Sequence, residues 1–319
     1  MPSDQVLGAR AGQGRSGASV TPGIGAAVAA MVAWGFSGIF VALTTQPGLV
    51  VALERLWLGV PLVLGLLKGT QRRLSWRQFK RTVPGGVFLA GDIAMFFSAV
   101  KLTSIAAATV IGALQPALVL IVARPLFGER VRRRELLWTL LALVAVGVVV
   151  SGNRGSAPDA GLGDLLATGS LCCWTGYWLV SKRVRMQGAS DPSHARGALG
   201  SVEYTAGVML VAPVVMVPIT LCSGEHLSFG CPQDWLWIGL MALIPGSAHL
   251  LVNWAHRLVD VSVSSVIVAV NPVVAAGAAV PILHQELGVS QLLGGLVAMV
   301  AVALIAQHAA RADERAPMG

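Results

Sequence analysis

Charged residues are scarce in this chain, and long stretches of it have almost none. Asp, Glu, Lys and Arg together make up 12% of the 319 residues, whereas 55% are hydrophobic. A soluble domain of this length needs a larger share of polar residues to cover its core. The composition therefore excludes a soluble globular protein and indicates an integral membrane protein.

Motifs for nucleotide, metal and hydrolytic chemistry are also missing. The sequence has no glycine-rich phosphate loop, no zinc-type His and Glu spacing and no nucleophile elbow. Of the four cysteines, Cys172 and Cys173 are adjacent within an apolar stretch, which fits no metal site. We therefore expect no enzyme activity, no cofactor and no metal. Cys222 and Cys231 flank one connection, where an oxidising compartment would permit a disulfide.

Ten apolar stretches are present, each close to the roughly 20 residues that a helix needs to cross a bilayer. They cover residues 22–44, 50–67, 83–100, 104–123, 135–152, 162–181, 201–221, 235–255, 261–283 and 288–308. The sequence thus predicts an all-α integral membrane protein with ten transmembrane helices.

Basic residues gather in every second connection between these stretches. With the N-terminus inside, all but three of the 23 Lys and Arg residues lie on the cytoplasmic side, as the positive-inside rule requires. The exceptions are Arg55, Lys101 and Arg154. The pattern predicts a multi-pass protein of the plasma (inner) membrane with both termini cytoplasmic. It also accounts for the net charge of +8 without a nucleic-acid partner, because the charges lie in separate short loops.

The chain contains a weak internal repeat. When Pro116 is placed on Pro272, Gln115 falls on Asn271 and Lys101 falls on Arg257. The predicted organisation is a disordered cytoplasmic tail at 1–21, a first unit at 22–152, an external linker at 153–161, a second unit at 162–308 and a cytoplasmic tail at 309–319. Five helices is an odd number, so the second unit is expected to be inverted relative to the first.

These residues carry a resemblance to a known family. The run Ile105-Ala106-Ala107-Ala108-Thr109 through Gln115-Pro116 to Gly128-Glu129-Arg130 resembles the EamA domain, and the second copy runs from Ser264-Ser265-Val266 through Asn271-Pro272 to Glu286. The chain as a whole is similar to the drug/metabolite transporter superfamily. One departure is His284-Gln285-Glu286, which stands where the family usually has Gly-Glu.

The resemblance implies a secondary transporter. Its expected partners are the lipid bilayer and a small-molecule solute, and a homodimer is an open option. Export of an amino acid, a related compound or a drug is implied, with the proton gradient as a candidate driver. A passive facilitator and a non-transporting sensor or assembly protein are the alternatives.

Two ionisable residues lie well inside the predicted spans, away from their ends. Asp92 falls in the middle of 83–100, and His249 is one position away from the repeat counterpart of Asp92. A carboxylate and an imidazole at this depth can exchange protons with a transport pathway. They can equally serve only to tie helices together, so both proton coupling and a structural role stay open.

Three amide side chains are candidates for solute contact. Gln115 and Asn271 each precede a proline, which removes a backbone donor and frees a carbonyl group one turn earlier. Asn253 lies four residues after His249 and shares its helix face. The alternative is that these amides satisfy the broken backbone or bond a neighbouring helix.

Aromatic residues inside the spans, and not only at their ends, suggest the walls of a binding site. Trp34, Trp174 and Tyr177 are the expected wall residues, with helix packing as the alternative. Glu54 and Arg55 are expected to open their helix as an interfacial pair, with gating or solute attraction as the alternative.

Overall fold

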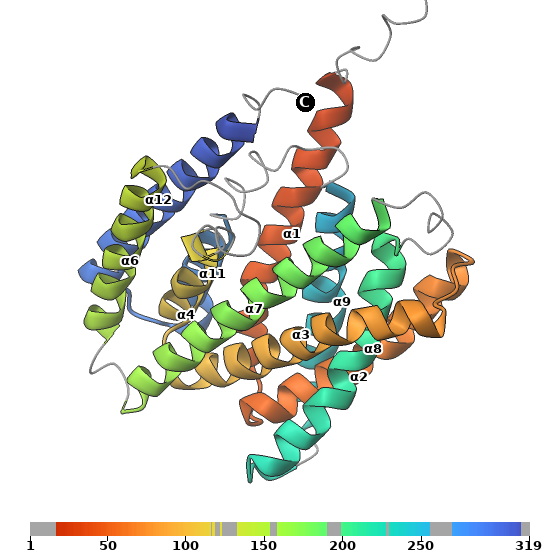
Figure 1. The fold of residues 1–319 in the computed structure, drawn as a ribbon. Helices are drawn as coiled ribbons and strands as arrows, with labels where there is room; N and C mark the ends of the chain where they lie inside the picture. The colour runs from red at the N-terminus through yellow and green to blue at the C-terminus, as the bar shows by residue number, and fades with distance from the viewer. Residues whose placement is uncertain are drawn as a thin grey trace, which may run out of the picture.

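The computed structural model describes residues 17–115, 117–118, 122, 133–153, 158–189, 199–227, 230–255 and 270–313. Within these ranges all regular structure is helical, as Figure 1 shows. The helices are α1 (Gly17–Leu43), α2 (Gly48–Gly69), α3 (Trp76–Leu102), α4 (Ile105–Gly112), α6 (Arg133–Asn153), α7 (Ala160–Ala189), α8 (Ser201–Cys222), α9 (Pro232–Ala255), α11 (Val270–Leu283) and α12 (Val289–Asp313). The all-α prediction is confirmed for this part of the chain, and α1 begins before residue 22.

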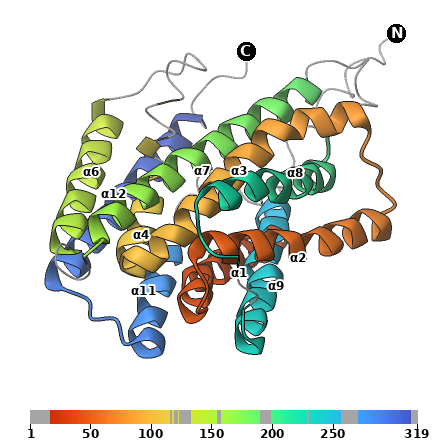
Figure 2. The same cartoon turned by 90° about the horizontal axis from the view of Figure 1, so that it is seen from below.

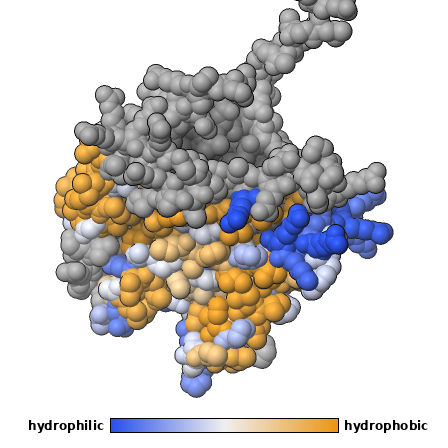
Figure 3. All heavy atoms as spheres, in the orientation of Figure 1, coloured by the Kyte–Doolittle hydropathy of each residue, from blue (hydrophilic) through white to orange (hydrophobic). Residues whose placement is uncertain are grey.

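Membrane character is clear for five of these helices. The segments Pro22–Leu43, Gly48–Gly69, Trp76–Leu102, Val202–Cys222 and Pro232–Leu251 are long and apolar enough to cross a bilayer. Figure 3 shows hydrophobic residues over much of one face of the molecule, with hydrophilic residues gathered at one side. That side holds the connection between α2 and α3 with the adjoining turns of both helices, and this region carries six exposed basic residues: Lys68, Arg72, Arg73, Arg77, Lys80 and Arg81.

The helices of the first half and of the second half pack on one another in matching pairs. If α1, α2, α3, α4 and α6 correspond in order to α7, α8, α9, α11 and α12, then the contact of α3 with α7 is the counterpart of that of α1 with α9. In addition α2 contacts α8, α4 contacts α11, and α6 contacts α12, and each of these pairs joins a helix to its own counterpart. Figures 1 and 2 both show α6 and α12 side by side at the edge of the bundle.

Small residues allow the central helices to approach closely. Gly85 and Gly86 of α3 face α8, where a Cβ atom added at Gly86 would lie 2.4 Å from the Cβ atom of Val211. From the other side, Gly207 of α8 receives the side chain of Thr82. Close backbone approach of this kind stabilises helix pairs in lipid, where the hydrophobic effect contributes little.

The fourth predicted span is interrupted in the structure. Helix α4 ends at Gly112, four residues before Pro116 in the sequence, and a turn follows at Ala113 and Leu114. Further helical residues appear at 115, 117, 118 and 122. The interruption lies where the proline at position 116 is expected to break the helix predicted over 104–123. In the second half, α11 begins at Val270, and residues 256–269 lie outside the described ranges.

Polar contacts tie several helix ends together at one end of the bundle. The Lys101 ammonium group at the end of α3 donates to the carbonyl oxygen of Thr44 at 2.6 Å. The carboxylate of Asp234 at the start of α9 accepts hydrogen bonds from the backbone N–H and the hydroxyl of Thr45, both at 2.7 Å. The connection between α1 and α2 is thereby bonded to both α3 and α9.

The start of α4 is held from the connection between α11 and α12. Gln285 Oε1 accepts from the backbone N–H of Ile105 at 3.2 Å, and Gln291 Nε2 donates to Ser104 Oγ at 3.3 Å. Gln285 belongs to the segment that departs from the family pattern. Gln285 thus supplies an acceptor for a first-turn amide of α4, which has no partner within its own helix.

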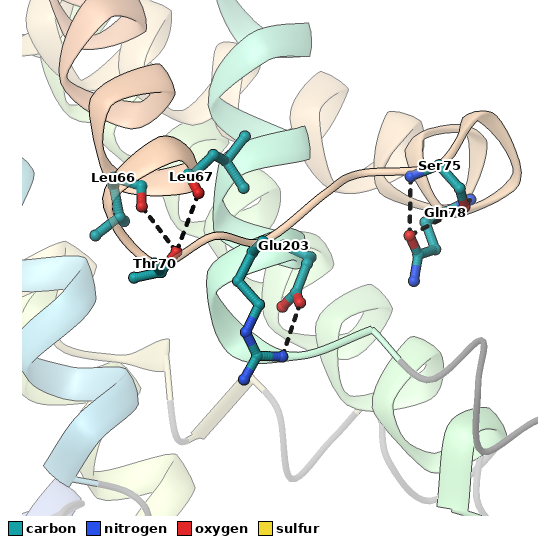
Figure 4. A network of polar contacts seen from close by, with 7 residues as sticks. Leu66, Leu67, Thr70, Ser75, Gln78 and Glu203 are labelled. Atoms are coloured by element: carbon teal, nitrogen blue, oxygen red, sulfur yellow. Dashed lines mark hydrogen bonds and ion pairs between the residues drawn. The ribbon is translucent and has the colours of Figure 1, made fainter.

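The connection between α2 and α3 is ordered by local caps and one ion pair, as Figure 4 shows. The hydroxyl of Ser75 accepts from the backbone N–H of Gln78 and the Gln78 side chain bonds back to the N–H of Ser75, which forms a capping box at the start of α3. Arg72 pairs with Glu203 of α8 at 3.0 Å.

Candidate functional site

Aromatic rings from three helices meet in the interior and form the aromatic cluster, which consists of Trp34, Trp174, Tyr177, Trp178 and His249. The Trp34 ring of α1 lies edge-on to Trp174 of α7, with 5.6 Å between ring centroids, and 5.0 Å from the imidazole of His249 in α9. Trp174 stacks on Tyr177 at 5.3 Å. The Trp34 indole N–H donates to the Pro245 carbonyl oxygen at 3.1 Å. The structure thus brings all three predicted wall residues together.

Asp92 lies on α3 and takes its hydrogen bond from α7. The Ser170 hydroxyl donates to Asp92 Oδ1 at 2.5 Å. Ser170 stands four residues before Trp174, so one face of α7 presents both the partner of Asp92 and the centre of the aromatic cluster. Burying a carboxylate at this depth is costly unless a donor meets it, and Ser170 provides that donor.

His249 and Asp92 do not bond to each other. His249 is only 7% exposed and packs against Trp34 and Trp174, while Asp92 bonds to Ser170. Among the described residues, the two groups share a neighbour instead: Arg55 of α2 interacts electrostatically with both. Asp92 thus pairs with a hydroxyl group and not with the imidazole, an arrangement that fits the alternative in which it ties two helices together.

Arg55 is the residue that the sequence interpretation placed wrongly. It was expected at an interfacial helix end, but its side chain is 7% exposed and its guanidinium carbon lies 5.4 Å from the centroid of the Phe97 ring. Its neighbour Glu54 does stay near the helix end, where it accepts from Gln46 Nε2 at 3.3 Å. One signal for Arg55 was already present in the sequence, because it is one of the three basic residues outside the cytoplasmic loops.

The predicted amides reach different positions. Asn271 Nδ2 donates to the Met31 carbonyl oxygen of α1 at 3.4 Å, close to Gly35, where an added Cβ atom would lie 3.2 Å from the Asn271 carbonyl oxygen. Asn271 therefore helps to dock α11 on α1. Gln115 is buried after the turn that ends α4. The Asn253 side chain lies outside the described residues.

Cys222 and Cys231 are both exposed and both free. The proposed disulfide is therefore absent from the structure. Cys231 is engaged by its own helix start instead, because its backbone N–H donates to Asp234 Oδ2 at 3.1 Å.

Comparison with known proteins decides the family. The model of the EamA-like transporter family matches residues 21–151 and 161–307, once in each half of the chain. The chain belongs to this family. EamA membership makes the protein a membrane transporter and confirms the resemblance seen in the sequence. No protein in the curated collection matches the chain.

One solved structure, titled only "Crystal structure of protein", has a similar fold. Its sequence is 20% identical, and the match covers 93% of this chain and 99% of the chain in that structure. The TM-score is 0.62. At this level of identity the likeness shows the fold alone. The EamA architecture is thus found in a solved structure, and the chemistry of the site must be argued from the residues of this chain.

Proposed function

We propose that this EamA transporter is a secondary exporter of a small metabolite, an amino acid or a related compound, in the plasma membrane. The aromatic cluster with Asp92 beside it carries the proposal. These residues come from α1, α3, α7 and α9, so they belong to both halves of the chain. A site shared by two repeats changes shape when one repeat rocks against the other, which is the basis of alternating access.

The proposed topology has ten membrane spans, arranged as two inverted units of five, with both termini cytoplasmic. The matching helix contacts of the two halves support the repeat. The hydrogen bonds at the end of the bundle support the orientation, since they join Thr44, Thr45, Lys101, Asp234 and Gln285. All five lie at or beside connections that the charge distribution assigns to the outside.

Proton coupling is proposed to involve Asp92 and His249. Both are ionisable groups in an apolar interior, both interact with the Arg55 charge, and the two belong to the counterpart helices α3 and α9. A change of protonation at either group alters the charge balance of the site. Solute binding and proton release can thereby be linked.

Proteoliposomes test this function directly. Purified protein is reconstituted with a pH dye inside, a pH gradient is imposed, and pooled amino acids and related metabolites are screened for movement. Asp92→Asn and His249→Ala are expected to abolish solute-driven proton flux, whereas Asp159→Asn, at an exposed position between α6 and α7, is expected to behave as wild type. If both variants keep the transport rate and its pH dependence, proton coupling is excluded.

A passive facilitator is the second candidate function. The structural role of the Asp92–Ser170 hydrogen bond favours it, because this bond alone explains why a carboxyl group is tolerated between α3 and α7. Solute movement without proton flux, at equal rates in both directions, would identify a facilitator. A solute that binds but never crosses the vesicle membrane would identify a sensor.

A further inference from the structure

Arg55 is a buried cation whose charge is not paired within the described part of the chain. Arg55 is 7% exposed and lies in the third turn of α2, and among the described residues its guanidinium group forms no hydrogen bond and no ion pair within 4 Å. Its close neighbour is the face of the Phe97 ring, at 5.4 Å. A cation–π contact contributes about 1–2 kcal/mol, far less than the cost of burying a full charge.

Asp92 is the acidic residue that interacts electrostatically with Arg55, but the two form no ion pair within 4 Å. The Asp92 Oδ1 atom is occupied by the Ser170 hydroxyl at 2.5 Å instead. His249, which also interacts with Arg55, is held between the rings of Trp34 and Trp174. No hydrogen bond within the described part of the chain therefore occupies the five donor hydrogens of the guanidinium group, and one member of the aromatic cluster, His249, lies within electrostatic range of them.

A guanidinium group in this situation selects a planar anion. Its fork of donors matches a carboxylate with two parallel hydrogen bonds, and the bond is stronger where water is excluded. A doubly charged phosphate fits less well, because Arg55 is one charge only and Asp92 close by would repel a second negative charge. The Phe97 ring and the aromatic cluster, to which His249 belongs, provide apolar and stacking surface for the rest of a solute.

We propose that Arg55 binds the carboxylate group of the transported solute and so determines specificity for organic acids, including amino acids, over amines and neutral compounds. The inference rests on the proposed transport function. The solute carboxylate then forms the ion pair that Arg55 does not form with the described residues. Without solute, the buried Arg55 charge has no such partner, which is energetically unfavourable. Solute binding thus stabilises the conformation in which Arg55 is buried.

Two matched pairs of probes test the proposal without any need to know the natural solute. 3-Phenylpropionate is compared with 3-phenylpropionamide, and phenylalanine with phenylalaninamide, because each pair differs only in the carboxylate group and all four carry a ring for the aromatic cluster. Binding to the purified wild-type protein in detergent is followed by calorimetry. In at least one pair the acid is expected to bind at least tenfold more tightly than the amide.

Variants of Arg55 assign the preference to this residue. Arg55→Gln is expected to remove the difference between acid and amide, and Arg55→Lys to keep part of it, because the charge remains while the fork is lost. Arg72→Gln is the matched control, since Arg72 is an exposed arginine that pairs with Glu203. Equal binding of acid and amide in both wild-type pairs would overturn the proposal even if every variant failed to fold.

The same probes separate this proposal from the transport function. If the acid binds through Arg55 but never crosses a proteoliposome membrane, the binding role of Arg55 stands and the proposed export function is contradicted. If acid and amide cross at equal rates, transport stands and the role of Arg55 is wrong.

Discussion

The hydroxyl group of Ser170 on α7 donates a hydrogen bond of 2.5 Å to the carboxylate of Asp92 on α3. These two helices belong to different halves of the chain, and the matching contact of α1 with α9 places Trp34 against His249. The two halves are therefore joined by a polar contact between α3 and α7 and by an aromatic contact between the counterpart helices α9 and α1. Both have to adjust if the halves move against each other.

Ser170→Ala removes the donor that meets the buried Asp92 carboxylate. Interhelical hydrogen bonds in membrane proteins contribute about 1–2 kcal/mol at most, so we expect a loss of this size in the free energy of unfolding in detergent. Thr175→Ala is the control on the same helix, because the Thr175 hydroxyl bonds only the Leu171 carbonyl of its own helix. Equal stability of the two variants would show that the Ser170 bond contributes nothing specific.

The protein is expected to tolerate loss of the Trp34 N–H group better than loss of the whole Trp34 ring. Trp34→Phe removes the hydrogen bond to Pro245, at a cost of about 1 kcal/mol, whereas Trp34→Ala also removes the contacts with Trp174 and His249 and costs about 3–5 kcal/mol. Trp57→Ala serves as the control, since Trp57 is 48% exposed. Thermal unfolding in detergent measures all three, and a similar loss for Trp57→Ala would contradict the interior role of Trp34.

Close packing of α3 on α8 predicts that even one methyl group is harmful at Gly86. The added Cβ atom would lie 2.4 Å from the Val211 Cβ atom, so Gly86→Ala is expected to destabilise the protein by about 1–3 kcal/mol. Gly65→Ala on α2 is the matched control, because nothing lies within 4 Å of its added Cβ atom. We expect that variant to be neutral or slightly more stable. Unfolding in detergent measures both variants. An equal change in the free energy of unfolding for the two would contradict the close packing of α3 on α8.

Glu225 gives the structure a pH dependence outside the spanning helices. Its carboxylate accepts hydrogen bonds from the backbone of Leu49 and Val50, where α2 begins at a proline cap without a side-chain acceptor. Burial nevertheless raises the pKa of Glu225 above its ordinary value of 4.5. The stability that the protonated carboxyl group contributes is therefore present below pH 4.5 and is lost as the pH rises through the raised pKa.

Glu225→Gln should accordingly make the protein more stable than wild type at neutral pH, and the difference should shrink as the pH falls toward 4.5. Thermal unfolding at a series of pH values measures this, with Glu286→Gln as an exposed control. A difference that is constant over the whole pH range would mean that the titration of Glu225 is not coupled to folding.

Much of this fold was predictable because the bilayer imposes simple rules. Long apolar segments specify helices, and the repeat anticipated the two EamA matches. The aromatic residues Trp34, Trp174 and Tyr177 were recognisable because rings inside a span are not explained by the membrane interface. The helix break after Gly112 occurs four residues before Pro116 in the sequence, but its extent depends on packing and does not follow from the proline alone.

The partners of the buried charges were not predictable. Ser170 is an ordinary small residue until α7 is packed on α3, and only then does its hydroxyl face Asp92. Arg55 was assigned to an interface because it lies near the start of an apolar segment, where snorkelling explains most arginines. The stronger signal was its exception to the charge distribution, which it shares with Lys101, and the Lys101 ammonium group also proves to be bonded inside the fold.

The exposed cysteines allow the proposed orientation to be tested in cells. Cys222 and Cys231 flank the connection between α8 and α9, which should face the outside, so a membrane-impermeant maleimide should label them in intact cells. Thr70→Cys, placed in the variant Cys222→Ser/Cys231→Ser, introduces a thiol at an exposed position of the α2–α3 connection, which should react only after permeabilisation. Labelling that requires a reductant would reveal a disulfide. Labelling at position 70 in intact cells would show that the topology is the opposite of the proposed one, with the basic loops outside.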